Sequence, residues 1–131
     1  MEYLLDTVTL VRYLTNSGHL TQEVREIFEK ADNNECQFYI STVSLMEILY
    51  LAEKNRIPIS LEEVVEKIRL SNIYEVIDLS TEIILTAKTV NFHELHDRLI
   101  LATAKYLEIP VISPDSQFNE VEGIEVIWQS S

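Results

Sequence analysis

Glycine, proline and cysteine are all scarce in this chain of 131 residues, which holds two glycines, three prolines and one cysteine. So few glycines and prolines argue against long disordered linkers and against an all-β fold with many tight turns. Apolar residues make up 47% of the chain, enough for a real core, so residues 1–131 are predicted to form a single domain. The lone Cys36 excludes an intramolecular disulfide, and its position before an apolar run favours a buried, unreactive side chain.

Long apolar stretches are also missing. No segment reaches the roughly 18 consecutive apolar residues that a membrane-spanning helix needs. The first residues lack a basic segment, and Asp6 and Arg12 interrupt the apolar run there. We therefore expect no signal peptide, no membrane partner and a reducing, cytoplasmic location.

Basic residues are the third shortage. The chain has 10 Lys and Arg against 22 Asp and Glu, for a net charge of −12. This balance argues against the basic footprint of most nucleic-acid-binding proteins. Part of the acidic excess is explained if some carboxylates form a metal site that a cation neutralises, and the remainder if they lie on a solvated surface.

Short apolar runs alternate with longer amphipathic stretches along the chain. The short runs predict strands at residues 2–5, 37–40, 74–77, 110–113 and 123–128, the last as a candidate edge strand. The longer stretches predict helices at 8–14, 21–33, 42–55, 60–70, 80–90 and 97–107. Alternating strands and helices predict an α/β fold with a mostly parallel sheet. In such sheets ligands bind beyond the carboxyl ends of the strands.

Four acidic residues stand near those predicted strand ends. Asp6 closes the first strand, Glu47 lies in the second turn of the helix after the second strand, and Asp115 follows the fourth. Asp97 begins the most apolar helix. Carboxylates gathered at one point raise one another's pKa, and a divalent cation removes that conflict. An all-oxygen set favours Mg²⁺ or Mn²⁺ over zinc, and such an ion can activate water against a phosphodiester.

Each of these acids also has a purely structural interpretation. Asp6 and Asp97 are suitable helix N-caps, and Ser44 with Glu47 matches a capping box. Asp115 sits in a Ser-Pro-Asp sequence that is typical of an ordinary turn. The sequence alone leaves both interpretations open for every one of them.

Four segments carry a resemblance to a known family. Residues 3–7 (YLLDT), 41–47 (STVSLME), 96–104 (HDRLILATA) and 111–115 (VISPD) resemble the PIN domain, and more narrowly the VapC-type toxins of toxin–antitoxin pairs. The resemblance spans residues 3 to about 118. It implies a three-layer α/β/α fold around a central, mostly parallel sheet of four to five strands. It also implies a Mg²⁺- or Mn²⁺-dependent endoribonuclease that cleaves RNA with metal-activated water, an antitoxin protein as partner, and a homodimer.

The resemblance also assigns site residues. Asp6, Glu47 and Asp97 fall where the family keeps its principal acids, and Asp115 falls where many members keep a fourth. Thr7 and Ser113 match polar positions that support the site. One position departs from the pattern: Val8 stands where many relatives carry asparagine, so a side chain able to bond a metal-bound water or a phosphate is absent.

Other residues allow two interpretations each. Arg12 and Arg98 are candidates for contact with an RNA phosphate, or for surface ion pairs. His96 is a candidate to orient a carboxylate or the start of the helix, and a structural role is favoured over that of a general base. The early amphipathic helices, near residues 10–14 and 24–28, offer a groove for an antitoxin segment or a dimer contact.

Two other function classes compete with the ribonuclease. A PIN-like module that binds an antitoxin or another protein but cleaves little is consistent with the acidity of the chain and with Val8. A phosphotransfer receiver or small phosphatase fits less well, because Glu2 and Asp6 are not adjacent and no lysine follows Lys105.

Overall fold

The computed structural model of the protein describes residues 1–128 and contains a five-stranded sheet. Its strands are β1 (Glu2–Leu5), β2 (Gln37–Ser41), β3 (Tyr74–Ile77), β4 (Val111–Ile112) and β5 (Val126–Ile127), in the order β3-β2-β1-β4-β5. All four strand pairings are parallel. The predicted parallel sheet is confirmed, and β5 lies at an edge as expected. The last two strands are shorter than predicted, with two residues each.

Six α-helices occur within residues 1–128, close to the six predicted segments. They are α1 (Thr7–Thr15), α2 (Gln22–Asp32), α3 (Thr42–Glu53), α4 (Leu61–Arg69), α5 (Thr81–Ala87) and α6 (Leu95–Leu107), followed by a 3-10 turn, η1 (Ser116–Glu120). The predicted start of α6 at Asp97 is wrong by two residues, because Glu94 caps the helix. The predicted end of α5 is late by three residues. None of these helices is long and apolar enough to cross a membrane.

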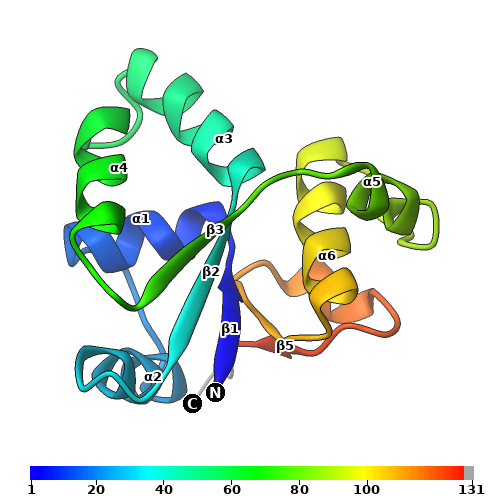
Figure 1. Ribbon diagram of the computed structural model, residues 1–131, viewed down its shortest axis with the longest axis horizontal. Helices are drawn as coiled ribbons and strands as arrows, with labels where there is room; N and C mark the ends of the chain where they lie inside the picture. Colours follow the sequence, from blue (N-terminus) through cyan, green and yellow to red (C-terminus); the bar gives the residue numbers. More distant parts are fainter. Residues whose placement is uncertain (129–131) are drawn as a thin grey trace.

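The helices cover both faces of the sheet, which gives three layers (Figure 1). Leu5 points into a core shared with α1, α2 and α4, whereas Leu4 points into a second core shared with α5, α6 and η1. A central parallel strand buried on both faces is expected to be mostly apolar, and β1 follows that rule from Tyr3 to Leu5, with only its first residue, Glu2, charged and exposed. The expected three-layer α/β/α architecture is therefore confirmed.

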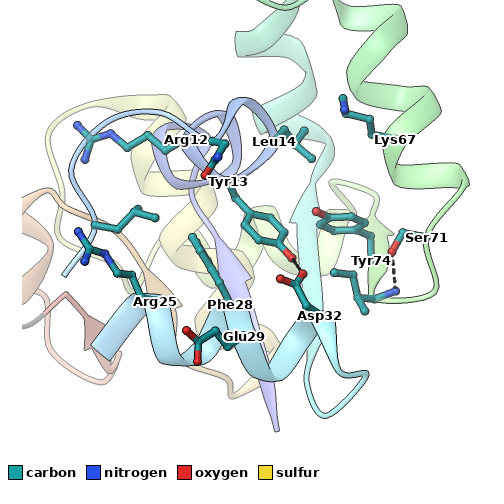
Figure 2. A pocket seen from close by; sticks show the side chains of 13 residues that line it. Arg12, Tyr13, Leu14, Arg25, Phe28, Glu29, Asp32, Lys67, Ser71 and Tyr74 are labelled. Carbon is teal, nitrogen blue, oxygen red and sulfur yellow. Dashed lines mark hydrogen bonds between the residues drawn. The ribbon is translucent and has the colours of Figure 1, made fainter. Parts of the chain in front are cut away.

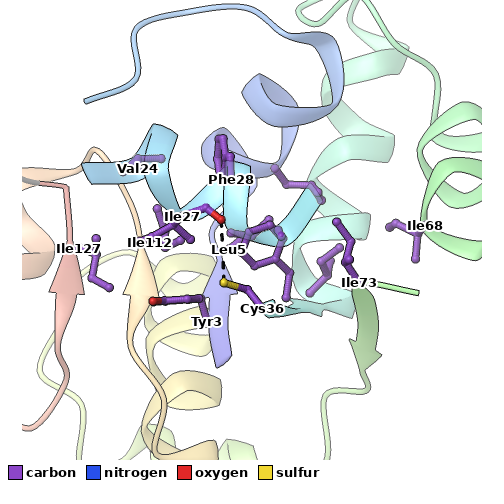
Figure 3. Packing of buried hydrophobic residues seen from close by; sticks show 14 of the residues in the cluster. Tyr3, Leu5, Val24, Ile27, Phe28, Cys36, Ile68, Ile73, Ile112 and Ile127 are labelled. Atoms are coloured by element: carbon purple, nitrogen blue, oxygen red, sulfur yellow. Dashed lines mark hydrogen bonds between the residues drawn. The ribbon is translucent and has the colours of Figure 1, made fainter. Parts of the chain in front are cut away.

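The first core is mostly aliphatic and contains a cluster of aromatic rings around Phe38. Phe38 of β2 is fully buried and meets the rings of Tyr13, Phe28 and Tyr74 with centroids 5.7–6.3 Å apart. Cys36 is buried at the edge of the same core, where its thiol faces the carbonyl oxygen of Ile27 (Figure 3). The expected structural role of this cysteine agrees with its position.

β1 lies at the centre of the sheet, between β2 and β4. Because both pairings are parallel, the carboxyl ends of these three strands are neighbours at one edge of the sheet. From β1 the chain passes through α1 and α2 to β2 on one side of β1, and β4 later pairs on the other side. Residue Asp6, which directly follows β1, therefore lies between the ends of β2 and β4. Crevices of this kind are where α/β sheets bind ligands.

One stability prediction concerns the start of α4. The Ser60 hydroxyl accepts the Glu63 N–H (3.1 Å) and the Glu63 carboxylate accepts the Ser60 N–H (3.3 Å), which completes the predicted capping box. Replacing Ser60 by alanine is expected to lower the free energy of unfolding by about 1 kcal/mol, because an N–H at the helix start loses its acceptor. Urea unfolding measures this, with Ser60→Thr as the variant that keeps the cap. An unchanged midpoint in Ser60→Ala would contradict it.

Candidate active site

Asp6 lies at the centre of the candidate site. Its side chain is 5% exposed, and Oδ1 accepts the Thr9 N–H at 2.8 Å, so that Asp6 is the N-cap of α1. Thr9 in turn donates its hydroxyl to the Ile112 carbonyl at 2.9 Å, which ties α1 to the end of β4. The cap interpretation of Asp6 is thus confirmed, and one carboxylate oxygen remains for another partner.

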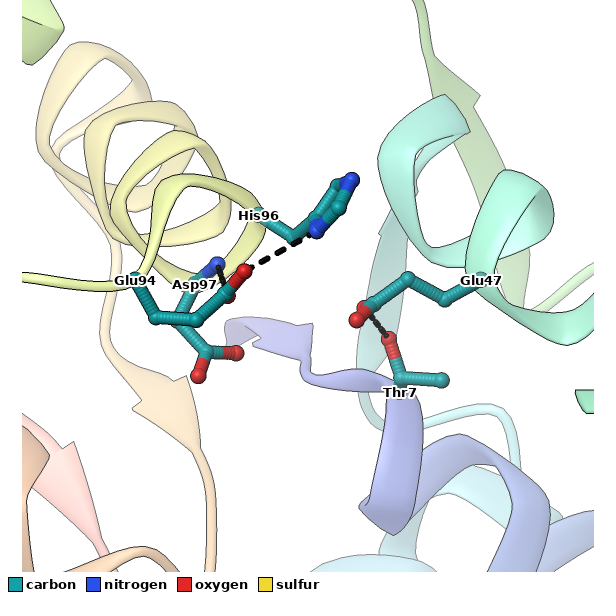
Figure 4. A network of polar contacts seen from close by, with 5 residues as sticks. All are labelled: Thr7, Glu47, Glu94, His96 and Asp97. Atoms are coloured by element: carbon teal, nitrogen blue, oxygen red, sulfur yellow. Dashed lines mark hydrogen bonds and ion pairs between the residues drawn. The ribbon is translucent and has the colours of Figure 1, made fainter. Parts of the chain in front are cut away.

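Glu47 approaches from the neighbouring helix. Thr7 Oγ1 donates to Glu47 Oε1 at 2.5 Å and lies 3.0 Å from the Ser44 hydroxyl (Figure 4). The capping-box interpretation of Ser44 and Glu47 is wrong, because α3 begins at Thr42 with Ser41 as its N-cap. Glu47 therefore lies one turn inside the helix and has no capping role. The hydrogen bond from Thr7, which follows Asp6 directly, holds the Glu47 carboxylate on the side of the site.

Asp97 enters from the other side of the sheet, on the first turn of α6. The cap of this helix is Glu94, which accepts the Asp97 N–H at 2.8 Å with Oε2 and contacts His96 Nδ1 at 3.0 Å with Oε1. The N-cap interpretation of Asp97 is therefore wrong. Figure 4 shows the Asp97 carboxylate directed into the space between α6 and α1.

Asp115 and Ser113 follow β4. The Ser113 hydroxyl is buried and accepts the Asp115 N–H at 3.1 Å, while Asp115 Oδ1 accepts the Gln117 N–H at 2.9 Å. The turn interpretation of Asp115 is thus confirmed, as it also caps η1. One of its carboxylate oxygens has a partner within the turn, and the side chain remains partly exposed.

The electrostatics show that the four predicted acids act on one another. Burial, together with the charges of neighbouring acids, raises the pKa of Asp97 to about 7. Burial contributes most, followed by the charges of Glu94, Glu47, Asp6 and Asp115 in that order. Burial also raises the pKa of Asp6, with Glu47 adding to the effect and the Thr9 and Ser113 groups opposing it. The structure therefore brings Asp6, Glu47 and Asp115 within electrostatic reach of Asp97, and Glu47 within reach of Asp6.

Glu94 is a fifth acid that sequence reasoning missed. Burial by itself raises its pKa, but hydrogen bonds from the Asp97 N–H, the His96 N–H and the His96 ring outweigh burial and lower it. Glu94 is therefore ionised beside Asp97. The signal for it is its place three residues before Asp97, which is the spacing between an N-cap and the N–H that it accepts. Glutamate is an unusual N-cap, so Asp97 was the more typical candidate.

The carboxylates of the site fit a divalent cation that is bound directly by only one or two of them. Within residues 1–128, no three His, Cys, Asp or Glu side chains lie close enough together to bind one ion directly. The donors are all carboxylates, and the pKa of Asp97 is raised first by burial and then by the charges of the neighbouring acids. Mg²⁺ commonly uses one or two carboxylates and keeps several waters, so it suits carboxylates that surround a space without closing on it.

The two candidate arginines, Arg12 and Arg98, both donate hydrogen bonds to backbone carbonyls. Arg12 donates to the His19 carbonyl at 3.0 Å, with its guanidinium 5.7 Å from the Trp128 ring centroid. Arg98 donates its Nε–H to the Ala87 carbonyl at 2.9 Å. Neither forms an ion pair with a carboxylate in the described part of the chain. The ion-pair interpretation is therefore wrong, and contact with an RNA phosphate stays a prediction.

A separate groove lies beside α1 and α2. It has a volume of about 580 Å³ and lies between these helices, the last turn of α4 and the start of β3 (Figure 2). Three of the ten basic residues line it, Arg12, Arg25 and Lys67. Tyr13 crosses the groove and donates to Asp32 at 2.6 Å, and burial together with this bond raises the pKa of Tyr13.

Comparisons with known proteins agree with this architecture. A sequence comparison with curated proteins finds no match. Among solved structures, the chain is similar to VapBC2 from Rickettsia felis bound to a promoter DNA fragment (18% identity, TM-score 0.72, covering 98% of this chain and 100% of the other). It is similar to DNA-bound VapBC from Salmonella typhimurium (21%, 0.71, 97% of each chain) and to a toxin–antitoxin complex from Klebsiella pneumoniae (22%, 0.61, 95% of each chain).

At these identities the solved structures establish a shared fold. The sequence model of the PIN domain matches residues 3–124, a span that includes all five acids of the site. With the three-layer fold, the parallel sheet and this match in hand, the chain belongs to the PIN domain family.

Proposed function

We propose that this protein is a divalent-metal-dependent endoribonuclease whose site is formed by Asp6, Glu47, Asp97 and Asp115. Members of the PIN domain family are in general nucleases. The observation that carries the proposal is the gathering of four carboxylates around the end of the central strand β1, where burial and the neighbouring acids raise the pKa of Asp97 to about 7. Four carboxylates kept together at this cost are explained if the site works with a cation bound.

Each side chain has a definite part in this proposal. Asp6 and Asp97 would hold the ion with carboxylate oxygens from opposite sides of the β1 end, and Glu47 and Asp115 would add negative charge around it. A bound Mg²⁺ or Mn²⁺ would lower the pKa of a coordinated water and offset charge on the phosphate. Thr7 orients Glu47, Ser113 orients the turn of Asp115, and Glu94 holds the first turn of α6.

The direct test is cleavage of RNA under controlled metal conditions. The wild type is incubated with single-stranded and hairpin RNAs, and with DNA of the same sequences, in Mg²⁺, in Mn²⁺ and in excess chelator. We expect cleavage of RNA that stops in chelator and returns when the metal is restored. Cleavage that continues in chelator would exclude the metal-dependent mechanism, and intact RNA under every condition would exclude the nuclease.

Thr7 provides a finer prediction. Thr7→Val keeps the shape of the side chain but removes the hydrogen bond that holds Glu47. Partners of metal ligands are typically worth about 10–100-fold in metal affinity or activity, so we expect a loss of that size in Mn²⁺ affinity by calorimetry. Thr7→Ser keeps the hydroxyl and is expected to bind Mn²⁺ like the wild type. Equal affinity in all three proteins would show that Thr7 does not position the site.

We also propose that the protein is a cytoplasmic toxin with an antitoxin partner, and that it forms a homodimer. The groove between α1, α2 and α4 supports a partner. Its lining has three cations against two acids, Glu29 and Asp32, and such a small positive excess in a chain of net charge −12 suits an acidic segment. The alternative is a module that binds the partner and cleaves little, which is consistent with Val8 being 45% exposed near Asp6. An absence of cleavage together with tight antitoxin binding would favour that alternative.

A further inference from the structure

A second pocket opens directly beside the acids, between α3 and the start of α6. It has a volume of about 410 Å³ and is lined by Met46, Glu47, Tyr50, Leu51 and His96. Glu47 belongs both to this pocket and to the acid site, so an occupant of the pocket lies one side chain away from the carboxylates. Figure 4 shows His96 and Glu47 extending from α6 and α3 toward the same space.

The lining combines an apolar surface with aromatic rings. Met46 and Tyr50 are one helical turn apart on α3 and are 50% and 53% exposed, so neither side chain contributes to the core. His96 faces them from α6, with Nδ1 held by Glu94. In the described part of the chain its Nε2 makes no hydrogen bond, which leaves one polar group at the pocket for a ligand. An apolar pocket with few polar groups is typical of a site for a flat, partly polar molecule, and its volume is at the lower end of the roughly 300–1,000 Å³ of such sites.

The charge of the protein decides what kind of contact with RNA is effective. A protein that neutralises phosphates with many lysines and arginines gains affinity from released counterions. This chain, at a net charge of −12, has little of that gain available. Stacking of bases on aromatic side chains does not depend on net charge and suits an acidic protein better. The pocket contains one carboxylate, Glu47, which Thr7 holds on the side of the acid site.

One cation stands at the rim of the pocket. Lys54 Nζ lies 5.7 Å from the centroid of the Tyr50 ring, one turn beyond Tyr50 on the same face of α3. No carboxylate within residues 1–128 forms an ion pair with it. A nucleotide with its base in the pocket would find a positive charge at this rim and the metal-binding carboxylates on the opposite side.

From these features we infer that the pocket binds one nucleobase of the RNA substrate, next to the phosphate that is cleaved. Tyr50 and Met46 supply the stacking surface, His96 Nε2 bonds an edge of the base, and Lys54 faces the adjoining phosphate. The inference rests on the proposed ribonuclease function for the identity of the ligand. On this inference, α3 and His96 determine which base is bound at the cleavage site, whereas the carboxylates bind the metal.

Occupancy of the pocket can be measured without any catalysis. The chain has two methionines, Met1 and Met46, so a protein labelled with ¹³C-methyl methionine gives two signals, and Met46→Leu assigns them. The probes are adenosine, cytidine and uridine, which carry no charge, with ribose as the control. We expect at least one nucleoside to shift the Met46 signal in a saturable way, ribose to leave it in place, and Tyr50→Ala to abolish the shift. No shift with any nucleoside, or an equal shift with ribose, would overturn the inference.

Kinetics give the second measurement. Tyr50→Ala is expected to raise KM for a single-stranded RNA about 10-fold, the effect of losing one stacked base, with a smaller change in kcat. Tyr50→Phe keeps the ring and is expected to behave like the wild type. The matched control is Leu49→Ala, an exposed apolar residue of the same helix that does not line the pocket. Equal KM values for Tyr50→Ala and Leu49→Ala would overturn the inference.

A second copy of the chain is the competing occupant. If a second copy covers the pocket, the Met46 signal will change with protein concentration in the absence of nucleoside. The Tyr50→Ala variant will then also have half the molecular mass of the wild type in analytical ultracentrifugation. That result would overturn the base-binding role. The proposed function fails separately: a wild type that cleaves no RNA would exclude the nuclease, while the nucleoside titration would still decide whether the pocket takes a base.

Discussion

Asp97→Asn is expected to lower kcat/KM for RNA cleavage by about 10²–10³-fold or more while the fold remains intact, because it removes an electrostatic contact to the reacting phosphate and its ion. Asparagine has nearly the same shape as aspartate. The helix that carries residue 97 is capped by Glu94 and does not need the Asp97 carboxylate. Loss of activity in this variant is thus separable from loss of structure, which circular dichroism and thermal unfolding will verify.

The matched control for this experiment is Asp78→Asn. Asp78 directly follows β3, so it also stands at the carboxyl edge of the sheet, but it is exposed and is not among the charges that shift the pKa of Asp97. It is expected to cleave RNA like the wild type. Undiminished cleavage by Asp97→Asn would exclude the site, and equal losses in both variants would show only a general effect of charge at this edge.

The second large effect concerns whether the wild type or Asp97→Asn is the more stable protein. We expect one order without metal and the opposite order with metal bound. The folded protein holds the Asp97 proton up to a pKa of about 7, whereas the unfolded chain releases it near 3.8. Between these values the folded state binds more protons, so stability falls as the pH rises from about 4 to about 7. In chelator above pH 7, Asp97→Asn is therefore expected to be more stable than the wild type. Because the side chain is partly exposed, about 1–2 kcal/mol is expected rather than the full shift.

Added metal should reverse this order. A cation that binds only the folded wild type stabilises it by about 2.7 kcal/mol at 100 times its dissociation constant, and the variant gains little. Urea unfolding of both proteins, at about pH 4.5 and about pH 8, with Mg²⁺ or with chelator, gives the complete comparison. A wild type that is more stable than Asp97→Asn in chelator at the higher pH would mean that the carboxylates do not repel one another as described.

The sequence was sufficient to predict the order of the elements and the acids that follow strands. β1 could be predicted because its apolar run ends abruptly at Asp6, and α4 because Ser60 and Glu63 form a complete capping box. Sheet order could not be predicted. Hydrophobic periodicity reports which face of a segment is buried and carries no information about which strand lies beside it. The position of Asp6 between the ends of β2 and β4 is visible only in three dimensions.

Two local details were missed for a related reason. Glu94 was not expected as a helix cap, because Asp97 is the more typical residue for that position and the apolar pattern begins after it. The last two strands were predicted too long, because β-branched residues mark an extended segment but not the length over which a neighbour pairs with it. Within residues 1–128, β5 pairs with β4 alone, over Val126 and Ile127.

The central place of β1 has a consequence for synthesis of the protein. β1 is synthesised well before β4, one of its two neighbours in the sheet. Thr9 and Ile112, which are hydrogen-bonded in the folded protein, are 103 positions apart. At about 5–20 residues per second, roughly 5–20 seconds separate their synthesis. Until then one edge of β1 is open and Asp6 lacks its surroundings. A growing chain therefore lacks the assembled cluster of carboxylates until β4 has been made, and the RNA cleavage that we propose would begin only after that point.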